Sequence, residues 1–567
     1  MNNLNSVYQT SATDALGREL TPISGFRSGK YVGLFYFLWH GQHAADKIRN
    51  ITELLKTNYT DLFDPSPDNK EIPYSSWCHF QEPLFGYYNS LDPWVMRRHI
   101  ELFIHMGIDF LVMDFTNGVY YDKPLKMLMD LLLEYRAAGF RVPGISFYVN
   151  IAPQEITSRL YKEVYTDPAY GSLVFCGNCK KPMIISVPHL ISRELNEFFD
   201  VRVSQWYRAQ YPETIFPYWD ITRDWHKYTD MVSVSLAQSG TSFSFSYESW
   251  DGQKHDNWGR GYTTAAKANG DVDAIQRGDN FQEGWNAAMA LDPDIIFVTG
   301  WNEWVMQKMN LHEFFPDYFV DDFPCYTDNF NVEFSRDAEM TKVPAYKLNK
   351  DGSYAEEGYG DNYVMQLMEN VRRFKGISCE NQVSAGIYKA VATKKPGRDC
   401  EGFYAVTRYY EPAPRTFIKE VAVTTDHNNL YFDVIAADDI QIPRHPCTNW
   451  MNLFIRINDL RGPAWNGFHY VINRHPGAGF VTSVERINGN EASAAGNAFI
   501  SVNGNRMKFT IPRSSVNNHG SPLDISFKIA DDVTDETNIL DYYVSGEVFP
   551  LGRLGYTYKE KETGAFL

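Results

Sequence analysis

An acidic side chain flanked by two indoles follows a strongly apolar segment near the middle of the chain. Residues 294–298 read Asp-Ile-Ile-Phe-Val, and residues 299–304 continue as Thr-Gly-Trp-Asn-Glu-Trp. An apolar run of this kind is typical of a strand buried on both faces of a parallel sheet. Glu303 would then stand just past the carboxyl end of a strand, where barrel enzymes place their chemistry. A carboxylate beside an amide and two flat rings suits a polar, ring-shaped ligand such as a sugar.

Cleavage of a glycosidic bond usually needs two carboxyl groups, one to protonate the leaving oxygen and one to act as nucleophile or base. Glu303 is the first candidate for a catalytic carboxylate. Asp114 and Asp220 compete for the second role because each ends another predicted strand, although an Asp at such a place is as often a turn residue. Glu283 is better explained as a capping residue in the first turn of a helix.

Further side chains at the predicted strand ends are candidates for binding the substrate. They are Trp39, His40, Tyr218, Trp301, Asn302 and Trp304, together with Arg260 in a long aromatic loop. Aromatic residues make up 15% of the chain, and most of these rings must belong to the core. Rings outside the core could bind a sugar, because the flat C–H faces of sugars stack on aromatic rings. The sequence shows no phosphate-cradling glycine loop and no Gly-x-Ser-x-Gly elbow, which disfavours nucleotide enzymes and serine hydrolases.

No metal and no cofactor is expected at this site. Cys176 and Cys179 have the spacing of a zinc knuckle, but a structural zinc needs four ligands and no second pair follows. His40 likewise lacks enough neighbouring ligands to make a zinc site. Seven cysteines, an odd count, do not form a disulfide scaffold.

The elements that would position these residues alternate between strands and helices from about residue 30 to residue 305, which predicts βα units and a parallel sheet. The expected strands are 31–39, 108–115, 144–150, 182–186, 214–220, 231–237 and 295–301, and the expected helices are 92–106, 123–138, 192–210, 281–291 and 360–375. Seven to eight such units predict an α/β fold, a (β/α)₈ TIM barrel, with a doubly wound open sheet as the alternative.

The C-terminal part of the sequence has a different pattern of predicted secondary structure. From about residue 400, short strands follow one another, expected at 420–424, 429–436, 449–458, 469–473, 498–502, 506–511 and 523–530. Strands at this spacing, separated by turn residues, indicate a β-sandwich. The predicted division is a barrel over 1–378, a linker over 379–400 and a sandwich over 401–567.

Length and charge narrow the class of partner. A chain of 567 residues is long enough for two or three domains, and its net charge of -17, without a basic patch, argues against nucleic acid and favours a neutral oligosaccharide or polysaccharide. No apolar run is long enough to span a membrane, so no membrane partner is expected. The start of the chain is polar, which predicts a cytoplasmic protein if this terminus is native, and a secreted or periplasmic one if a signal peptide was removed.

Three segments together resemble a known family. Residues 87–93 read Tyr-Tyr-Asn-Ser-Leu-Asp-Pro, residues 97–115 contain Arg-Arg-His-Ile and Gly-Ile-Asp-Phe-Leu-Val-Met-Asp-Phe, and residues 299–304 close the series. Their order is similar to that of the barrels of glycoside hydrolase families 71 and 99. The resemblance covers about residues 30–375 and implies a retaining endo-acting α-mannosidase or α-mannanase. In that family two Glu lie three residues apart, one assisting the sugar 2-hydroxyl and one acting as acid/base; Glu303 matches the first, whereas Met306 stands at the second position.

The C-terminal region resembles a family 9 carbohydrate-binding module at residues 429–434, 450–455 and 465–473. Such modules hold a sugar between two aromatic rings, sometimes with a structural calcium. The resemblance implies Trp450 and Trp465 as the nearest candidates, although Trp450 opens a predicted strand and fits a core position equally well.

The sequence therefore predicts a glycoside hydrolase with polysaccharide degradation as its role. The rival from another class is a non-catalytic glycan-binding protein, which Met306 favours. A second rival is a glycan lyase that cleaves uronates, against which the acidic net charge argues mildly.

Overall fold

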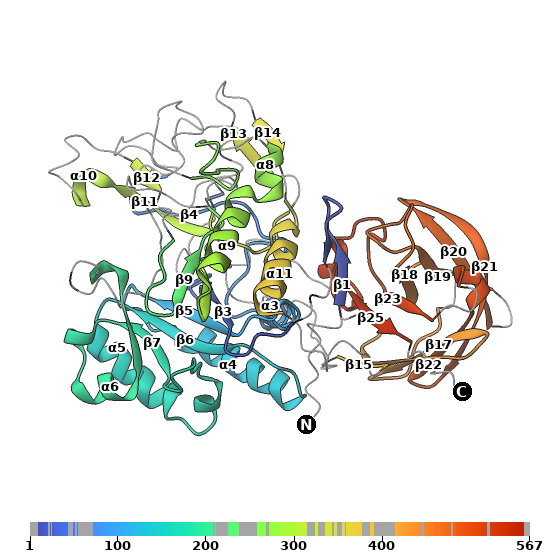
Figure 1. Ribbon diagram of the computed structural model, residues 1–567, viewed down its shortest axis with the longest axis horizontal. Helices are drawn as coiled ribbons and strands as arrows, with labels where there is room; N and C mark the ends of the chain where they lie inside the picture. The colour runs from blue at the N-terminus through green and yellow to red at the C-terminus, as the bar shows by residue number, and fades with distance from the viewer. Residues whose placement is uncertain are drawn as a thin grey trace.

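The computed structural model of the chain contains a mixed α/β lobe and a lobe of antiparallel strands (Figure 1). It describes residues 10–20, 23, 25–42, 49–50, 54, 72–207, 210, 225–237, 258–267, 272–314, 324–326, 335–342, 345–348, 354–357, 359–376, 386–390, 414–443, 447–477, 480–518 and 522–560. In these ranges no helix combines the length and the apolar character that crossing a membrane requires.

A parallel sheet forms the centre of the first lobe. Its seven described strands run in the order β8-β7-β6-β5-β3-β10-β9. Their bounds are β3 Tyr31–Tyr36, β5 Phe110–Phe115, β6 Gly144–Val149, β7 Met183–Ser186, β8 Asp200–Val203, β9 Met231–Val234 and β10 Ile295–Val298. Nearly every residue of these strands is buried, because helices cover the outer face while side chains fill the inner face.

The sheet curls so that its two edge strands approach each other. Arg202 on the edge strand β8 forms an ion pair with Asp230, which directly precedes the other edge strand β9, at 3.1 Å from Nη2 to Oδ2. Inside the curl, the Phe35 ring lies 6.1 Å from the rings of Tyr148 and Phe297 on two other strands. The described residues thus form a curled parallel sheet, not the complete eight-stranded barrel that the sequence predicted; the strand expected at 214–220 lies outside the described residues.

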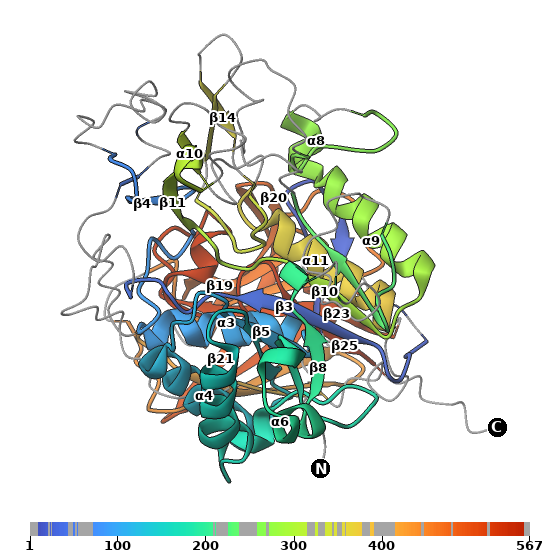
Figure 2. The ribbon, with the colours of Figure 1, turned by 90° about the vertical axis from the view of Figure 1, so that its left-hand side faces the viewer.

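Helices connect the strands along the outer face, as Figure 2 shows for α3, α4 and α6. Their bounds are α3 Pro93–Met106, α4 Asp122–Ala137, α5 Pro153–Leu160, α6 Arg193–Phe198, α8 Val272–Arg277, α9 Asp279–Leu291, α10 Leu311–Phe314 and α11 Asn362–Lys375. The predicted start of α3 is confirmed: Asp92 accepts hydrogen bonds from the backbone N–H groups of Trp94 and Val95, and Pro93 opens the helix.

One prediction in this lobe is wrong. A single helix was expected over 192–210, but the structure has the short helix α6, the strand β8 and a 3₁₀ turn over Gln205–Tyr207. The sequence of β8, Asp-Val-Arg-Val, places two β-branched residues in alternation, a strand signal that the helical pattern of the preceding turn obscured.

The second lobe is antiparallel. Its strands are β15 Ile387–Lys389, β16 Ile418–Thr425, β17 Asn429–Ala436, β18 Asn452–Ile457, β19 Tyr470–Pro476, β20 Val481–Asn488, β21 Glu491–Asn503, β22 Arg506–Pro512, β23 Asp524–Asp531, β24 Glu547–Phe549 and β25 Gly555–Lys559. The sheet folds over a common core, in which the Phe432 ring on β17 lies 5.1 Å from Phe527 on β23. All seven strands expected here are present, while β15, β20, β24 and β25 were missed.

The N-terminus belongs to this second sheet. The hairpin β1 Thr10–Thr13 and β2 Glu19–Leu20 pairs through β1 with β25, so that β1 lies between the two lobes in Figure 1. The strand β15, in the predicted linker, pairs with β16. Both strands lie outside the range 401–567 that was expected to form the sandwich.

Buried polar contacts join the two lobes. Asp361, at the start of α11, accepts hydrogen bonds from Arg553 at 2.7 Å and from the Tyr543 hydroxyl at 2.9 Å, and all three side chains are buried. Arg372 on α11 donates to the Thr10 carbonyl at 3.0 Å. The lobes therefore share one continuous interior at α11 and β1.

Candidate functional site

The Trp-Asn-Glu-Trp segment leaves the carboxyl end of β10, as predicted. It continues into β11 Val305–Asn310, which pairs antiparallel with β4 Trp77–His79. Met306 lies within β11 opposite Cys78 and is buried. The position of the second Glu in the resembling family is therefore a buried strand residue in this chain.

Glu303 is buried in an ion pair. Its side chain is 6% exposed, and Oε2 accepts a hydrogen bond from Arg336 Nη2 at 2.9 Å, while the guanidinium of Arg336 is 1% exposed. The sequence led us to expect a carboxylate that projects freely into a cavity; its described partner is a buried cation. The ion pair favours the charged form of both groups, and a catalytic role for Glu303 stays a prediction.

A second carboxyl group contacts the same loop. Asp337 Oδ1 accepts a hydrogen bond from the backbone N–H of Glu303 at 2.6 Å. Burial raises the pKa of Asp337 to about 6, although the Glu303 N–H and the charges of Arg336 and Arg260 act in the opposite direction. A carboxyl group with this pKa is half protonated at pH 6, so Asp337 holds a proton in mildly acidic solution in which an ordinary aspartate is ionised.

The segment 335–341, which carries Arg336 and Asp337, lies directly against the loop after β10. The backbone N–H groups of Ala338 and Glu339 donate to the carbonyls of Gly300 and Trp301 at 3.2 and 2.9 Å. A Cβ atom at Gly300 would lie 2.7 Å from the Arg336 carbonyl oxygen, so this approach requires glycine. Sequence reasoning missed these residues, because the range 308–360 showed little periodicity and was interpreted as a long loop system.

Asn302 fastens the loop to the end of β3. Its Oδ1 accepts from the Phe37 N–H at 2.9 Å, and its Nδ2 donates to the Phe37 carbonyl at 3.2 Å and to the Tyr88 hydroxyl at 3.0 Å. Trp301 is fully buried and packs edge-on against Phe103 of α3 at 4.9 Å between ring centroids. The described contacts of both residues hold the fold together, and their contact with substrate stays a prediction.

A buried polar network lies behind this loop. The Tyr88 hydroxyl donates to Glu339 Oε2 at 2.9 Å, His99 Nε2 lies 2.8 Å from Glu339 Oε1, and the Tyr36 hydroxyl lies 2.9 Å from His99 Nδ1. Burial, and then the charge of Glu339, raises the pKa of Tyr36 and Tyr88 well above the usual value, so both hydroxyls keep their protons. The network fixes segment 335–341 to β3 and α3.

The predicted aromatic residues near the first strand pack together. The rings of His40 and Trp304 stack at 3.9 Å with an interplanar angle of 12°, and Trp39 meets Trp77 edge-on at 5.8 Å. Trp39 is 8% exposed, and His40 and Trp304 are less exposed, so little of these three side chains reaches the surface.

Asp114 lies at the end of β5 on the inner face, in register with Tyr148 of β6. Its Oδ1 accepts from the N–H of Thr116 at 3.0 Å and from the Thr116 hydroxyl at 2.7 Å. These are the contacts of a turn-capping Asp, the alternative that the sequence left open. Glu283 is not the capping residue that was predicted: it lies beyond the first turn of α9, which has no side-chain cap, and it accepts from the backbone N–H of Thr264 in another segment at 3.0 Å.

Arg260 is fully buried in the described structure. It donates to the carbonyls of Ser335 and Asp337 at 3.0 and 2.8 Å and lies over the rings of Tyr359 and Tyr363. It therefore holds the backbone of segment 335–341 in place. Its predicted contact with substrate in the cleft stays a prediction. Tyr218 and Asp220 lie outside the described residues.

Exposed apolar side chains follow four consecutive strands, and the sequence analysis did not single them out. Val119, Ile151, Leu190 and Trp206 come after β5, β6, β7 and β8, and Trp206 is 56% exposed. Polar contacts tie these loops together: the Tyr148 hydroxyl and Ser204 Oγ lie 3.2 Å apart, and Ser204 donates to Asn150 at 2.8 Å. The carboxyl end of β8 thus carries an exposed indole beside hydroxyl and amide groups, on the segment wrongly predicted as helix.

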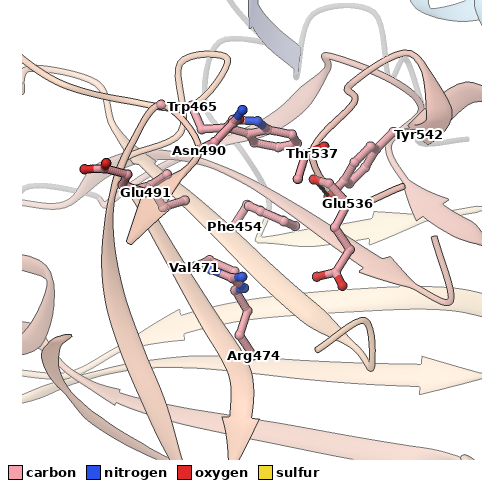
Figure 3. Close-up of a pocket in the computed structure, with 11 residues that line it drawn as sticks. Phe454, Trp465, Val471, Arg474, Asn490, Glu491, Glu536, Thr537 and Tyr542 are labelled. Carbon is pink, nitrogen blue, oxygen red and sulfur yellow. Dashed lines mark hydrogen bonds between the residues drawn. The ribbon is translucent and has the colours of Figure 1, made fainter. Parts of the chain in front are cut away.

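The second lobe has a hollow on its outer face, drawn in Figure 3. Trp465, Phe454 and Tyr542 supply its rings, and Asn490, Glu491, Arg474, Glu536 and Thr537 its polar groups. Trp450 belongs instead to the inner core and is 2% exposed. The expected pair of rings around one sugar is therefore not formed by Trp450 and Trp465, because they lie on opposite faces of the sheet.

The described residues contain no group of three or more His, Cys, Asp and Glu side chains placed to hold a metal ion. Cys176 and Cys179 are both exposed free thiols. Burial, and then the neighbouring Cys179, raises the pKa of Cys176.

No family model matches the chain, and no curated protein matches it. The chain is similar to a solved structure of the GH99 endo-alpha-mannosidase from Bacteroides thetaiotaomicron in complex with BIS-TRIS-propane, with 13% identity, 61% of this chain and 97% of that chain covered, and a TM-score of 0.35. A second structure of the same enzyme gives 14% identity over 61% and 97%, with a TM-score of 0.35. A glycoside hydrolase-like protein gives 10% identity over 63% and 97%, with a TM-score of 0.30. Similarity at this level assigns neither an activity nor a site residue to this chain.

Proposed function

We propose that the chain is a glycoside hydrolase that acts on a neutral oligosaccharide or polysaccharide at the carboxyl ends of its parallel strands. The observation that carries the proposal is a pair of carboxyl groups, Glu303 on the loop after β10 and Asp337 on the segment that packs against this loop. Glu303 faces a guanidinium, whereas Asp337 has a pKa of about 6. Two carboxyl groups whose surroundings favour different protonation states provide the acid and the base that glycosidic cleavage needs.

In this proposal Asp337 donates a proton to the leaving oxygen, and Glu303 acts as the ionised partner on the sugar. Asp114 remains a competing second carboxylate because it faces the interior of the curled sheet. Trp206, exposed just past the carboxyl end of β8, would stack on a sugar ring of the substrate. Only the family resemblance of the sequence indicates a specific sugar, and on that basis an α-mannoside is the first substrate to test.

A second candidate is a non-catalytic glycan-binding protein. The burial of Glu303 against Arg336, together with Met306 in the position of the second Glu, favours this candidate. A buried Arg–Glu pair can have a purely structural role, such as holding a loop in place, because breaking the pair leaves an uncompensated buried charge. In that case the aromatic rings would bind sugar without chemistry, and the hollow beside Trp465 would be an additional sugar-binding place.

Incubation with a panel of α-mannosides and other neutral oligosaccharides separates the two candidates. The proposal predicts new reducing ends on at least one substrate, and their loss in the Glu303→Gln variant. Saturable binding across the panel with no new reducing ends would favour the non-catalytic protein. An unsaturated product that absorbs in the ultraviolet would instead indicate a lyase.

A further inference from the structure

A second, larger hollow lies between the N-terminal hairpin and the loops of the antiparallel lobe. Its volume is about 560 Å³, within the range of small-molecule sites. Residues of the hairpin β1–β2, of the segment 456–469 and Arg553 line it, and none comes from the parallel strands. It is therefore separate from the proposed hydrolase site.

Three arginines, Arg456, Arg461 and Arg553, line the hollow together with two carboxylates, Asp14 and Glu19. Arg456 and Arg461 share one carboxylate, Glu19, at 2.8 and 3.0 Å. Arg486, beside the hollow, donates only to the carbonyls of His469 and Pro463 and has no carboxylate partner among the described residues. The other charged groups of the lining are paired, Asp14 with Arg18 and Arg553 with Asp361. Arg456, Arg461 and the neighbouring Arg486 against Glu19 therefore leave two positive charges uncompensated among the described residues, in a chain whose net charge is -17.

Asp14, Asn466 and Thr13 already accept hydrogen bonds from Arg18, Arg553 and Arg456, whereas His469 offers a donor to the hollow. His469 Nδ1 accepts the N–H of Ile457 at 3.0 Å, so the proton of the neutral ring lies on Nε2. Burial, and then the charges of Arg486 and Arg456, lowers the pKa of His469 to about 4, which reflects the positive potential here. Arg456 Nε is buried and finds no hydrogen-bond acceptor in the described part of the chain.

We propose that this hollow binds an oxyanion of a small polar ligand: a carboxylate, sulfate or phosphate group. The fork of a guanidinium matches such groups geometrically, and Glu19 already shows how a carboxylate sits between Arg456 and Arg461. A bound oxyanion would lie beside Glu19 or replace it, with the Nε2–H of His469 as a further donor. Because the lining joins the hairpin to the second lobe, the ligand would stabilise the contact between them.

Two variants with opposite expected effects test this proposal in the full chain. Arg461→Ala removes a side chain that is 79% exposed and therefore leaves the fold intact. Glu19→Gln removes the carboxylate that competes for the same cations. The matched control is Arg193→Ala, which removes a guanidinium that is 89% exposed and paired with Glu197 on α6, far from the hollow.

Isothermal titration with inorganic sulfate, inorganic phosphate and glucuronate measures the binding, with chloride at equal ionic strength and glucose as the charge-free comparison. We expect saturable binding of at least one of the three oxyanions and none of glucose. Arg461→Ala should weaken this binding about tenfold, the loss of one charge-assisted hydrogen bond, while Glu19→Gln strengthens it and Arg193→Ala leaves it unchanged. The three oxyanions compared with one another identify the preferred group.

The proposal is overturned if none of the three oxyanions binds saturably at low-millimolar concentration. It is equally overturned if Arg461→Ala and Arg193→Ala bind alike, or if chloride competes as well as sulfate does. Each result is independent of any glycosidase activity, so failure of the proposed function would leave this test unaffected.

Discussion

At the scale of single residues, the loop after β10 places two carboxyl groups in unlike surroundings. Glu303 faces the buried guanidinium of Arg336, and Asp337 accepts a backbone hydrogen bond while burial disfavours its charge. The sequence indicated Glu303 because a carboxylate after an apolar strand is conspicuous. It could not indicate Asp337, since 34 residues of chain separate the partners and only the folded backbone brings them together.

The raised pKa of Asp337 predicts a pH dependence of stability. Its pKa of about 6 exceeds the ordinary aspartate value of 3.8, so the native state binds the proton more tightly than the unfolded chain. The stabilisation is complete below pH 3.8 and is lost as the pH rises through about 6, by no more than about 3 kcal/mol. Urea unfolding of the wild type and Asp337→Asn at several pH values checks this.

The Asn variant can still accept the Glu303 N–H but cannot ionise. We therefore expect the difference in the free energy of unfolding between variant and wild type to shift in favour of the variant between about pH 4 and pH 6. A difference that stays constant over this window would contradict the raised pKa.

Trp206 offers a test of substrate contact that does not involve the chemistry. Because its ring is 56% exposed, Trp206→Ala should leave the melting temperature unchanged. If a sugar stacks on the ring, KM should rise about 3- to 10-fold while kcat changes little. The control is Phe480→Ala on the antiparallel lobe, whose ring is 58% exposed; equal kinetics for both variants would exclude this contact.

At the scale of elements, strong local signals were predicted well and weak ones were not. The helix α3 starts at Asp92–Pro93 as expected, since a cap and a proline act within one turn. The strand β8 has only four residues and begins one residue after the end of α6. Its alternating pattern was therefore too short to be distinguished from a continuation of the helix. The pairing of β1 with β25 joins the two ends of the chain, a contact that no local pattern encodes.

Asn302 joins the loop after β10 to the end of β3 through hydrogen bonds to Phe37, and its removal should lower the free energy of unfolding. Asn302→Ala would leave the buried N–H and carbonyl of Phe37 without their partners, so we expect a loss of about 3 kcal/mol in the free energy of unfolding. Urea unfolding measures it, with the exposed Asn286→Ala on α9 as the control. Similar stabilities for the two variants would show that the loop is held by other contacts.

At the scale of the whole molecule, the two lobes meet through charged groups that are removed from water. Asp361 is 1% exposed and pairs with Arg553, which is 5% exposed. Breaking a buried pair leaves an uncompensated charge and costs far more than breaking a surface pair. The lobes should therefore unfold together, unlike domains that are joined by a flexible linker.

Asp361→Asn tests this coupling. We expect a loss of about 3–5 kcal/mol in the free energy of unfolding, because Arg553 keeps its buried charge. Asp130→Asn is the control, since Asp130 and its partner Lys126 are 52% and 65% exposed and the pair is worth at most about 1 kcal/mol. Separate unfolding transitions for the two lobes of the wild type, or equal stabilities of the two variants, would contradict the coupling.

The central claim is that Glu303 takes part in cleaving a glycosidic bond, and the most direct measurement is the release of reducing ends by the wild type and by Glu303→Gln on the same oligosaccharide. Glutamine preserves a hydrogen-bond acceptor for Arg336 but not the charge. As for Asp361→Asn, we expect a loss of about 3–5 kcal/mol in the free energy of unfolding, so the circular dichroism spectrum is used to establish that the variant is folded under the assay conditions. We predict a fall in kcat of about 10²- to 10⁴-fold, the loss expected when acid–base assistance is removed. A folded Glu303→Gln variant that turns over at the wild-type rate would contradict the account.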